Sequence, residues 1–235
     1  CYVAVRQCLG GDIQAGGRMG HQNLLGMMGH FAVMPAFALL LGGHRTKLAV
    51  AILLTGATIA IVGGSRATIG LFGIGLVITT VLSMRSRMTG RKSAFAGVAI
   101  AALVLAAPVM TWAVDRRSDA AKASSNQERA AFINAATMMI KDHPLGVGGN
   151  QYVVVANVGG YSGRAGVAWN AGNRSAPVHN LYYLTTAELG FIGLAGLLTV
   201  IGGLIAYGWS SIRRVEGERA DFAVGATASL IVVAA

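Results

Sequence analysis

Hydrophobic and polar positions alternate in long blocks along this chain. Six apolar blocks are separated by short polar connectors and by one long polar segment at 112–178. The blocks occupy residues 24–41, 48–62, 67–83, 93–111, 181–209 and 222–235. A helix that crosses a bilayer needs about 20 residues, with a range of about 17–25. The pattern predicts an all-α, polytopic transmembrane helical bundle with one large loop, in which the second helix is short.

The blocks divide the chain into three regions. We assign 1–111 to transmembrane helices with short loops, 112–179 to a loop that contains an amphipathic helix, and 180–235 to further transmembrane helices. The chain starts at Cys1 instead of Met and stops inside an apolar run. We therefore expect a fragment of a larger polytopic protein, with its last helix truncated.

Composition supports a membrane protein and explains the positive charge. Hydrophobic residues make up 54% of the sequence and charged residues 12%, whereas a soluble domain carries roughly 25% charged residues. The net charge of +10 comes from basic residues in short clusters between the apolar blocks, so membrane topology explains it better than nucleic-acid binding. Cys1 and Cys8 fit no zinc or redox spacing, and a disulfide between them on an oxidising face stays open.

The basic clusters agree on one orientation. Because each span changes the side of the membrane, placing the basic connector 84–92 in the cytoplasm places 44–47 and 210–221 there too, and both are also basic. The same orientation puts the link 63–66 and the whole long loop on the outer face. Arginines on that face are exceptions to the charge bias and need a separate reason.

The long loop contains a helical pattern. Ser125 to Glu128 have capping-box spacing, and an apolar helical period follows at Phe132, Ile133, Ala136, Met139 and Ile140. The pattern predicts an amphipathic helix of about four turns that ends near Asp142, because Pro144 disfavours the helical conformation before it. Glycines at 146, 148 and 149 then allow tight turning, and the glycine-rich stretch 159–172 is predicted to be irregular.

A histidine stands where the long loop meets the next apolar block. An imidazole, whose ordinary pKa is about 6.5, can take a proton from a hydroxyl at physiological pH. His179 is therefore a candidate general base, and the alternative is an interfacial histidine that hydrogen-bonds the backbone at the helix start. Asn180 beside it could orient a substrate, although a helix cap is the simpler interpretation.

Arginines on the outer face are candidate phosphate ligands. Arg66 lies in the short GGSRATIG link, and a guanidinium suits the oxygens of a lipid-linked pyrophosphate because it donates two parallel hydrogen bonds. The alternative for Arg66 is contact with lipid headgroups. Arg129 lies near the start of the loop helix, where a cation is mildly unfavourable, so it suits either a phosphate contact or a solvated face. Arg18, Arg164 and Arg174 are further candidates, with solvated loop charges as the alternative.

Three more side chains are supporting candidates. Glu188 follows His179 by nine residues within an apolar block, which places it about 13 Å deeper along a straight helix. Such a carboxylate is often functional, or it ties two helices together. His21 is close to Arg18 in sequence and is expected to face the same outer cavity, whereas His30 is expected to pack within a helix.

Motifs of several other enzyme classes are missing from the sequence. It has no Asp-x-Asp pair for a metal-bound sugar nucleotide, no HExxH, no P-loop, no GxGxxG turn and no GxSxG elbow. We therefore predict no metal site and no cofactor.

Four groups of residues together carry a resemblance to a known family. They are Arg18 with GHQNLLG at 20–26, GGSR at 63–66, Arg129 ahead of MIKDHPLGVG at 139–148, and His179 and Asn180 ahead of ELG at 188–190. In this order, with these spans and one large outer loop, the chain resembles the O-antigen ligase and polymerase group of bacterial envelope enzymes. The resemblance covers nearly the whole chain. It departs at Phe132 and Ile133, where the family often has Trp.

The resemblance implies a metal-independent glycosyltransferase, multi-pass in the bacterial inner membrane, with its active face in the periplasm. The donor would be a glycan on undecaprenyl pyrophosphate, the acceptor a lipid A core or another glycan, and the surroundings membrane lipids, with no nucleic acid. The resemblance further implies that His179 activates the acceptor hydroxyl while Arg66 and Arg129 hold the pyrophosphate. Arg174 and Arg18 are weaker correspondences.

Several other functions stay open at this point. A polymerase of O-antigen or exopolysaccharide uses a similar donor and a different acceptor, and a protein O-glycosyltransferase is a third member of the class. From a different class, a polysaccharide or lipid transporter would place its binding groups near the bilayer midplane, where only Glu188 and His30 are expected. A purely structural membrane subunit would leave Arg66 and His179 replaceable.

Overall fold

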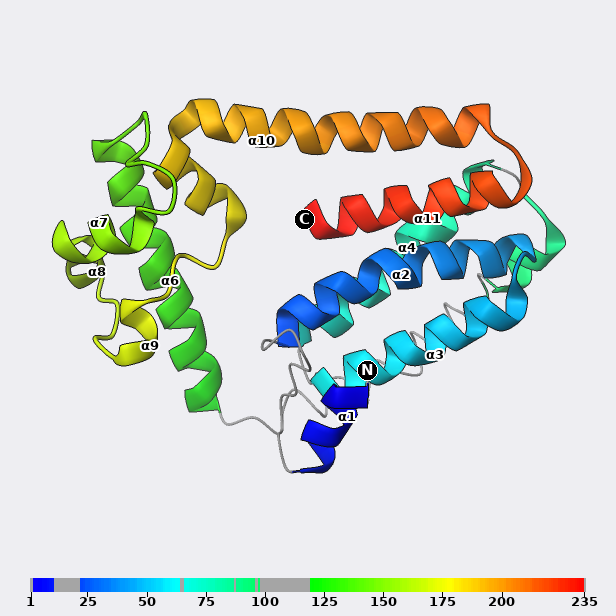
Figure 1. Ribbon diagram of the computed structural model, residues 1–235, viewed down its shortest axis with the longest axis horizontal. Helices are drawn as coiled ribbons and strands as arrows, with labels where there is room; N and C mark the ends of the chain where they lie inside the picture. The colour runs from blue at the N-terminus through cyan, green and yellow to red at the C-terminus, as the bar shows by residue number, and fades with distance from the viewer. Residues whose placement is uncertain are drawn as a thin grey trace. The chain divides into compact units, whose positions relative to one another are not determined.

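The computed structural model describes residues 2–10, 22–63, 66–86, 88–95, 97 and 119–234 (Figure 1). These residues form helices joined by turns and contain no strand, which confirms the all-α prediction. Three helices among them are long and apolar enough to cross a membrane, namely Leu25–Gly42, Thr68–Ser86 and Leu181–Arg214. The apolar helix Thr46–Ala60 is shorter, as predicted. Most of the predicted span 93–111 lies outside the described residues.

The chain divides into two compact units. Unit 1 comprises Cys1–Ala106 and Ile201–Ala235, and unit 2 comprises Ala107–Val200. In unit 1, the helix α2 (Gln22–Gly42) contacts α3 (Thr46–Gly63), α4 (Arg66–Ser86) and α11 (Gly217–Ala234), while the short α1 (Tyr2–Leu9) contacts α3. Gly225 leaves no room for a Cβ against the backbone of Met34 and Pro35. This close approach of α11 and α2 is the packing that small residues permit in membranes.

The three predicted basic connectors meet at one end of unit 1. Arg45 Nε donates to Glu218 Oε1 at 2.9 Å, and Lys92 Nζ lies 3.3 Å from Asp221 Oδ1. His44 Nε2 is 3.6 Å from the other carboxylate oxygen of Asp221. These contacts join all three connectors at one end of unit 1, as a shared side of the membrane requires, while the cytoplasmic location of that end stays a prediction.

The described part of unit 2 contains α6 (Asp119–Asp142), α7 (Tyr152–Val158), α8 (Tyr161–Arg164), α9 (Ala171–Arg174) and α10 (Leu181–Arg214) as far as Val200. Its apolar core is built mainly by α6, with Phe132, Ala135, Ala136 and Met139 buried. The predicted loop helix is therefore confirmed, and so is its end at Asp142. Its predicted start near Ser125 is wrong, because α6 begins at Asp119. The AAKA segment at 120–123 is a strong helix former, and no helix-breaking residue stands between it and Ser125.

A kink at Gly190 divides α10 into two sections (Figure 1). Gly190 has φ 68° and ψ −171°, a conformation available essentially to glycine alone. The loop after α6 supplies three backbone hydrogen bonds at the kink: Val147 N–H to Ala187 O at 3.0 Å, Gly148 N–H to Glu188 O at 2.8 Å, and Phe191 N–H to Pro144 O at 3.2 Å. Gly146 and Gly148 have φ values of +87° and +107°, so the predicted tight turning holds at both. The predicted continuous helix over 181–209 is wrong at Gly190, because the loop takes over the hydrogen bonds that a straight helix would make there.

Candidate functional site

His179 lies in the turn between α9 and α10, where its two neighbours are fixed. Val178 before it is buried in the core of unit 2. Asn180 after it accepts hydrogen bonds from the backbone N–H groups of Tyr182 at 3.0 Å and Tyr183 at 3.1 Å, which confirms that Asn180 caps α10. The imidazole itself is exposed and hydrogen-bonds no described residue. The turn therefore presents His179 to the surface in a defined position.

The ring of His179 packs against an aromatic side chain from α6. Its centroid lies 5.9 Å from that of Phe132, with an angle of 62° between the planes. Phe132 is 4% exposed, and its carbonyl accepts a hydrogen bond from the Tyr152 hydroxyl at 3.3 Å. An edge-on contact of this kind is favourable for aromatic rings. His179 thus has a rigid support, which sequence reasoning missed because the two residues are far apart in the chain.

Arg129 shares the surface of α6 that carries Phe132. The two residues are three positions apart on the helix, so their side chains are neighbours on one face. Arg129 is exposed, and its guanidinium forms no ion pair with any residue that the structure describes. Arg129 therefore lies one turn of α6 before the residue that packs against the His179 ring.

Arg174 is held beside the same part of α6 by the short helix α9. The Asn173 side chain donates to Glu128 Oε1, and Asn157 Nδ2 donates to the Arg174 carbonyl at 2.8 Å. The guanidinium of Arg174 lies 4.4 Å from the ring centroid of Trp169, a cation–π distance. Because Glu128 precedes Arg129, the bond to Asn173 places α9 next to the turn of α6 that carries Arg129.

Glu188 has a structural role. Its Oε1 accepts a hydrogen bond from the backbone N–H of Tyr152 at 3.0 Å. Tyr152 is the first residue of α7, so the carboxylate satisfies a free N–H at a helix start, where negative charge is favourable. This bond joins α10 to α7, as the interpretation in which Glu188 ties two helices together expects, while a functional role of Glu188 stays a prediction.

Arg18, His21, Arg66 and His30 are not among the described residues of unit 2. Arg18 and His21 lie outside the described residues. Arg66 is the first residue of α4 in unit 1, and its role stays a prediction. His30 packs within unit 1, fully buried, with its ring 4.2 Å from that of Phe72, as predicted.

A second polar cluster in unit 2 was not predicted. The Tyr161 hydroxyl donates to Asp142 Oδ2 at 2.9 Å and lies 3.2 Å from His143 Nε2. The Arg164 guanidinium lies 4.6 Å from the Tyr161 ring centroid. Burial, helped by the hydrogen bond and charge of Asp142, raises the pKa of Tyr161, so its hydroxyl stays protonated. Asp142 is thirteen residues beyond Arg129 on α6, about 20 Å along the helix, so Arg164 lies away from the His179 surface.

The described residues contain no group of three His, Cys, Asp or Glu side chains arranged as metal ligands. Independence from metal stays a prediction.

Comparison with known proteins identifies a family. Residues 30–198 match the family model described as O-antigen ligase. The match includes Arg66, Arg129, Arg174 and His179 and leaves out Arg18 and His21. Neither the curated proteins nor the solved structures yield a match.

Proposed function

Because the chain belongs to the O-antigen ligase family, we propose that it transfers a glycan from undecaprenyl pyrophosphate to an acceptor hydroxyl on a lipid A core. Family membership and apolar helices together make it a membrane protein of the glycosyltransferase-like O-antigen ligase and polymerase type. The identity of donor and acceptor, the independence from metal, the bacterial inner membrane and the periplasmic face are parts of the proposal. The O-antigen or exopolysaccharide polymerase is the second candidate.

One observation carries the proposal: an exposed histidine packs on Phe132 of α6, the helix that carries the exposed Arg129 one turn earlier. The His179 ring is supported by Phe132, and the Asn180 cap fixes its backbone. Arg129 lies on α6, and Arg174 ends α9, which the side chain of Asn173 joins to Glu128 of α6. An imidazole with free nitrogens can accept a proton, and guanidinium groups can stabilise a phosphate leaving group.

The proposed reaction needs one proton transfer and one displacement. His179 takes the proton of the acceptor hydroxyl, and the acceptor oxygen attacks the anomeric carbon of the glycan. The bond from that carbon to the pyrophosphate oxygen breaks, and undecaprenyl pyrophosphate leaves with the electron pair. Arg129 and Arg174 would neutralise the charge that develops on the leaving group, and Arg66 is a further predicted ligand of the pyrophosphate.

Complementation of a ligase-null bacterial strain tests this function. The full-length protein is expressed as wild type or as His179→Ala, membrane levels are matched, and glycan attached to lipid A core is measured. Rescue by wild type with an inactive, well-expressed variant supports the ligase and the base role. Equal rescue by both would overturn the role of His179. If the wild type fails to rescue the ligase-null strain, the same protein is expressed in a polymerase-null strain. Long glycans accumulating on the lipid carrier there would favour the polymerase.

A further inference from the structure

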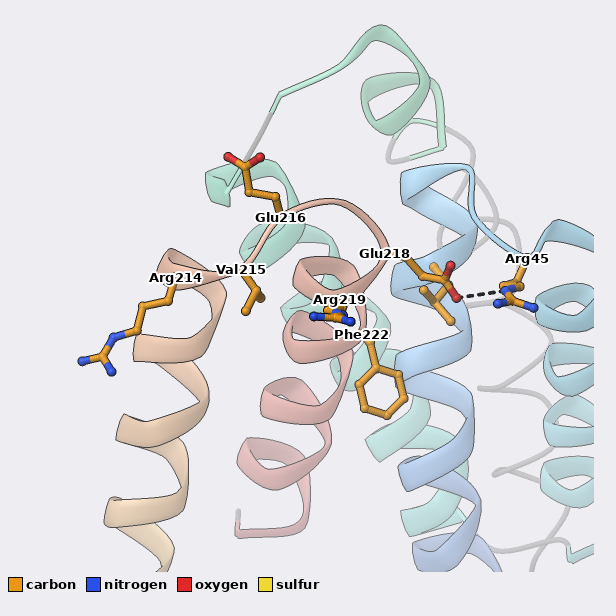
Figure 2. Close-up of a pocket in the computed structure, with 8 residues that line it drawn as sticks. Arg45, Arg214, Val215, Glu216, Glu218, Arg219 and Phe222 are labelled. Carbon is orange, nitrogen blue, oxygen red and sulfur yellow. Dashed lines mark hydrogen bonds and ion pairs between the residues drawn. The ribbon is translucent and has the colours of Figure 1, made fainter.

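Unit 1 contains a large open groove at the end where the basic connectors meet. The groove has a volume of about 960 Å³ and lies among the end of α10, the start of α11 and the turn between α2 and α3. We define this basic groove by six of its lining residues: Leu39, Arg45, Arg214, Glu218, Arg219 and Phe222. In Figure 2, Arg219 and Phe222 stand between Arg214 on one side and the Arg45–Glu218 pair on the other.

The polar part of the groove has more positive than negative charge. It is lined by three arginines and by two glutamates, Glu216 and Glu218. Glu218 is engaged with Arg45 Nε at 2.9 Å. Within the part of the chain that the structure describes, neither Arg214 nor Arg219 pairs with a carboxylate. Two cations from separate helices therefore stay available to an anion.

An adjoining cavity extends the positive charge. It shares Arg214 and Glu216 with the groove and adds Arg85 and Arg213, in a volume of about 460 Å³. Arg45, the residue before α3, has φ 47°, a conformation uncommon for residues other than glycine. The turn nevertheless has an arginine at this position instead of a glycine, and the arginine side chain lines the groove.

The groove changes from charged to apolar along α11. Phe222 follows Glu218 and Arg219 by four and three residues, so it lies about one turn further into the apolar part of the helix. Phe222 is 55% exposed, and Leu39 of α2 is half-buried beside the same cavity. A ligand that fills this groove therefore needs an anionic group next to an apolar one.

From the charge and its apolar continuation, we propose that the basic groove binds an anionic phospholipid, with the headgroup phosphate at Arg214 and Arg219 and an acyl chain along Phe222 and Leu39. Basic pockets between transmembrane helices on the cytoplasmic side bind anionic headgroups, and the predicted orientation puts this end of unit 1 in the cytoplasm. The proposal concerns a surface separate from His179 and holds for any reaction at that residue.

Native mass spectrometry of the purified protein in detergent tests the proposal. Phosphatidylglycerol and phosphatidylcholine with identical acyl chains are compared, and inorganic phosphate is added as a competitor. We expect phosphatidylglycerol to bind at least about five-fold more tightly, because one basic residue near a lipid surface contributes about that factor. Millimolar inorganic phosphate should not displace it, since phosphate alone cannot use the apolar part of the groove.

Matched variants locate the site. Arg219→Gln and Arg214→Gln should each weaken phosphatidylglycerol binding about five-fold, and Arg219→Lys should retain most of it. Lys47→Gln removes one charge from an exposed residue at the same end of unit 1, outside the groove, and should bind as wild type does. Equal affinity for both lipids, equal loss in the Lys47→Gln control, or displacement by inorganic phosphate would each overturn the proposal. Circular dichroism verifies that the variants fold.

Discussion

Unit 2 contains two histidine–aromatic pairs with similar geometry and different surroundings. His179 meets Phe132 edge-on at 5.9 Å, and His143 meets Tyr161 edge-on at 6.3 Å. In the second pair the Tyr161 hydroxyl contacts both His143 and Asp142. In the first pair phenylalanine has no hydroxyl, and the His179 ring hydrogen-bonds no described residue.

The difference teaches that packing alone does not make a reactive histidine. Both rings are exposed and both rest on a buried aromatic side chain. Nε2 of His143 contacts the Tyr161 hydroxyl just after the end of α6, which is typical of a histidine with a structural role. The His179 ring nitrogens hydrogen-bond no described residue, as the proposed role of a general base requires.

The largest expected effect comes from replacing each histidine with glutamine. In a transfer assay with lipid-linked glycan donor and acceptor, His179→Gln should lower the rate about 10³-fold, within the range of about 10²–10⁴ for a general base. His143→Gln keeps a side chain that can bond Tyr161 and should stay close to wild type. Similar losses in both variants would remove the distinction between the two pairs.

The arginines near the two pairs provide the next comparison. Arg129→Gln should lower kcat about 10²-fold, the usual cost of losing one group that stabilises a leaving-group charge. Arg164 lies over the Tyr161 ring, so Arg164→Gln should change stability more than kcat. Steady-state kinetics and thermal unfolding of both variants measure this. A larger loss of kcat for Arg164→Gln would relocate the reaction to the second pair.

A smaller effect is expected at the cap beside His179. Asn180→Ala should destabilise the start of α10 by about 1 kcal/mol and lower the transfer rate, because the backbone of His179 loses its support. Hydrogen exchange should quicken at the amides of Tyr182 and Tyr183, which donate to Asn180. Asn180→Asp keeps the acceptor oxygen and should restore both the protection and the rate. Unchanged exchange in Asn180→Ala would show that the cap contributes nothing.

The smallest effect concerns Tyr152, which supports Phe132 from behind. Burial raises the pKa of Tyr152 from 10.0 to about 12. The Tyr152 hydroxyl therefore stays protonated to a higher pH in the folded protein than in the unfolded chain. The stability that protonated Tyr152 contributes is complete below pH 10 and is lost as the pH rises toward about 12. Tyr152→Phe loses the bond to the Phe132 carbonyl, about 1 kcal/mol or less, and should show a weaker loss of stability at alkaline pH. Denaturation measured across that range tests the sign, and an unaltered alkaline profile would contradict it.

Much of the fold could be predicted because apolar blocks of membrane length are a strong signal. The three long spans, the short second span and the end of α6 follow from block length and from Pro144. The start of α6 could not be predicted, because the capping-box spacing at Ser125 occurs by chance inside a segment that forms helix. The kink at Gly190 could not either, since it depends on hydrogen bonds from a loop more than forty residues earlier.

The candidate site was predicted in part. His179 and Asn180 followed from their place at the boundary of loop and apolar block, and Arg129 from its place on the loop helix. The contacts of Phe132 with His179 and of Asn173 with Glu128 join segments distant in the sequence, so no local pattern reveals them. For Glu188 the sequence predicts only a distance from His179 along a straight helix. Its hydrogen bond to α7 depends on tertiary structure, which no local pattern reveals.

The kink at Gly190 has a consequence for the order in which the protein is made. The loop 144–148 shares three backbone hydrogen bonds with residues 187–191 of α10, so neither has a complete set alone. Domains fold as they are synthesised, N-terminal parts first, and α6 with its loop leaves the ribosome before Gly190 does. The loop therefore emerges first and can pair with the backbone on either side of Gly190 as soon as that part of α10 has been made.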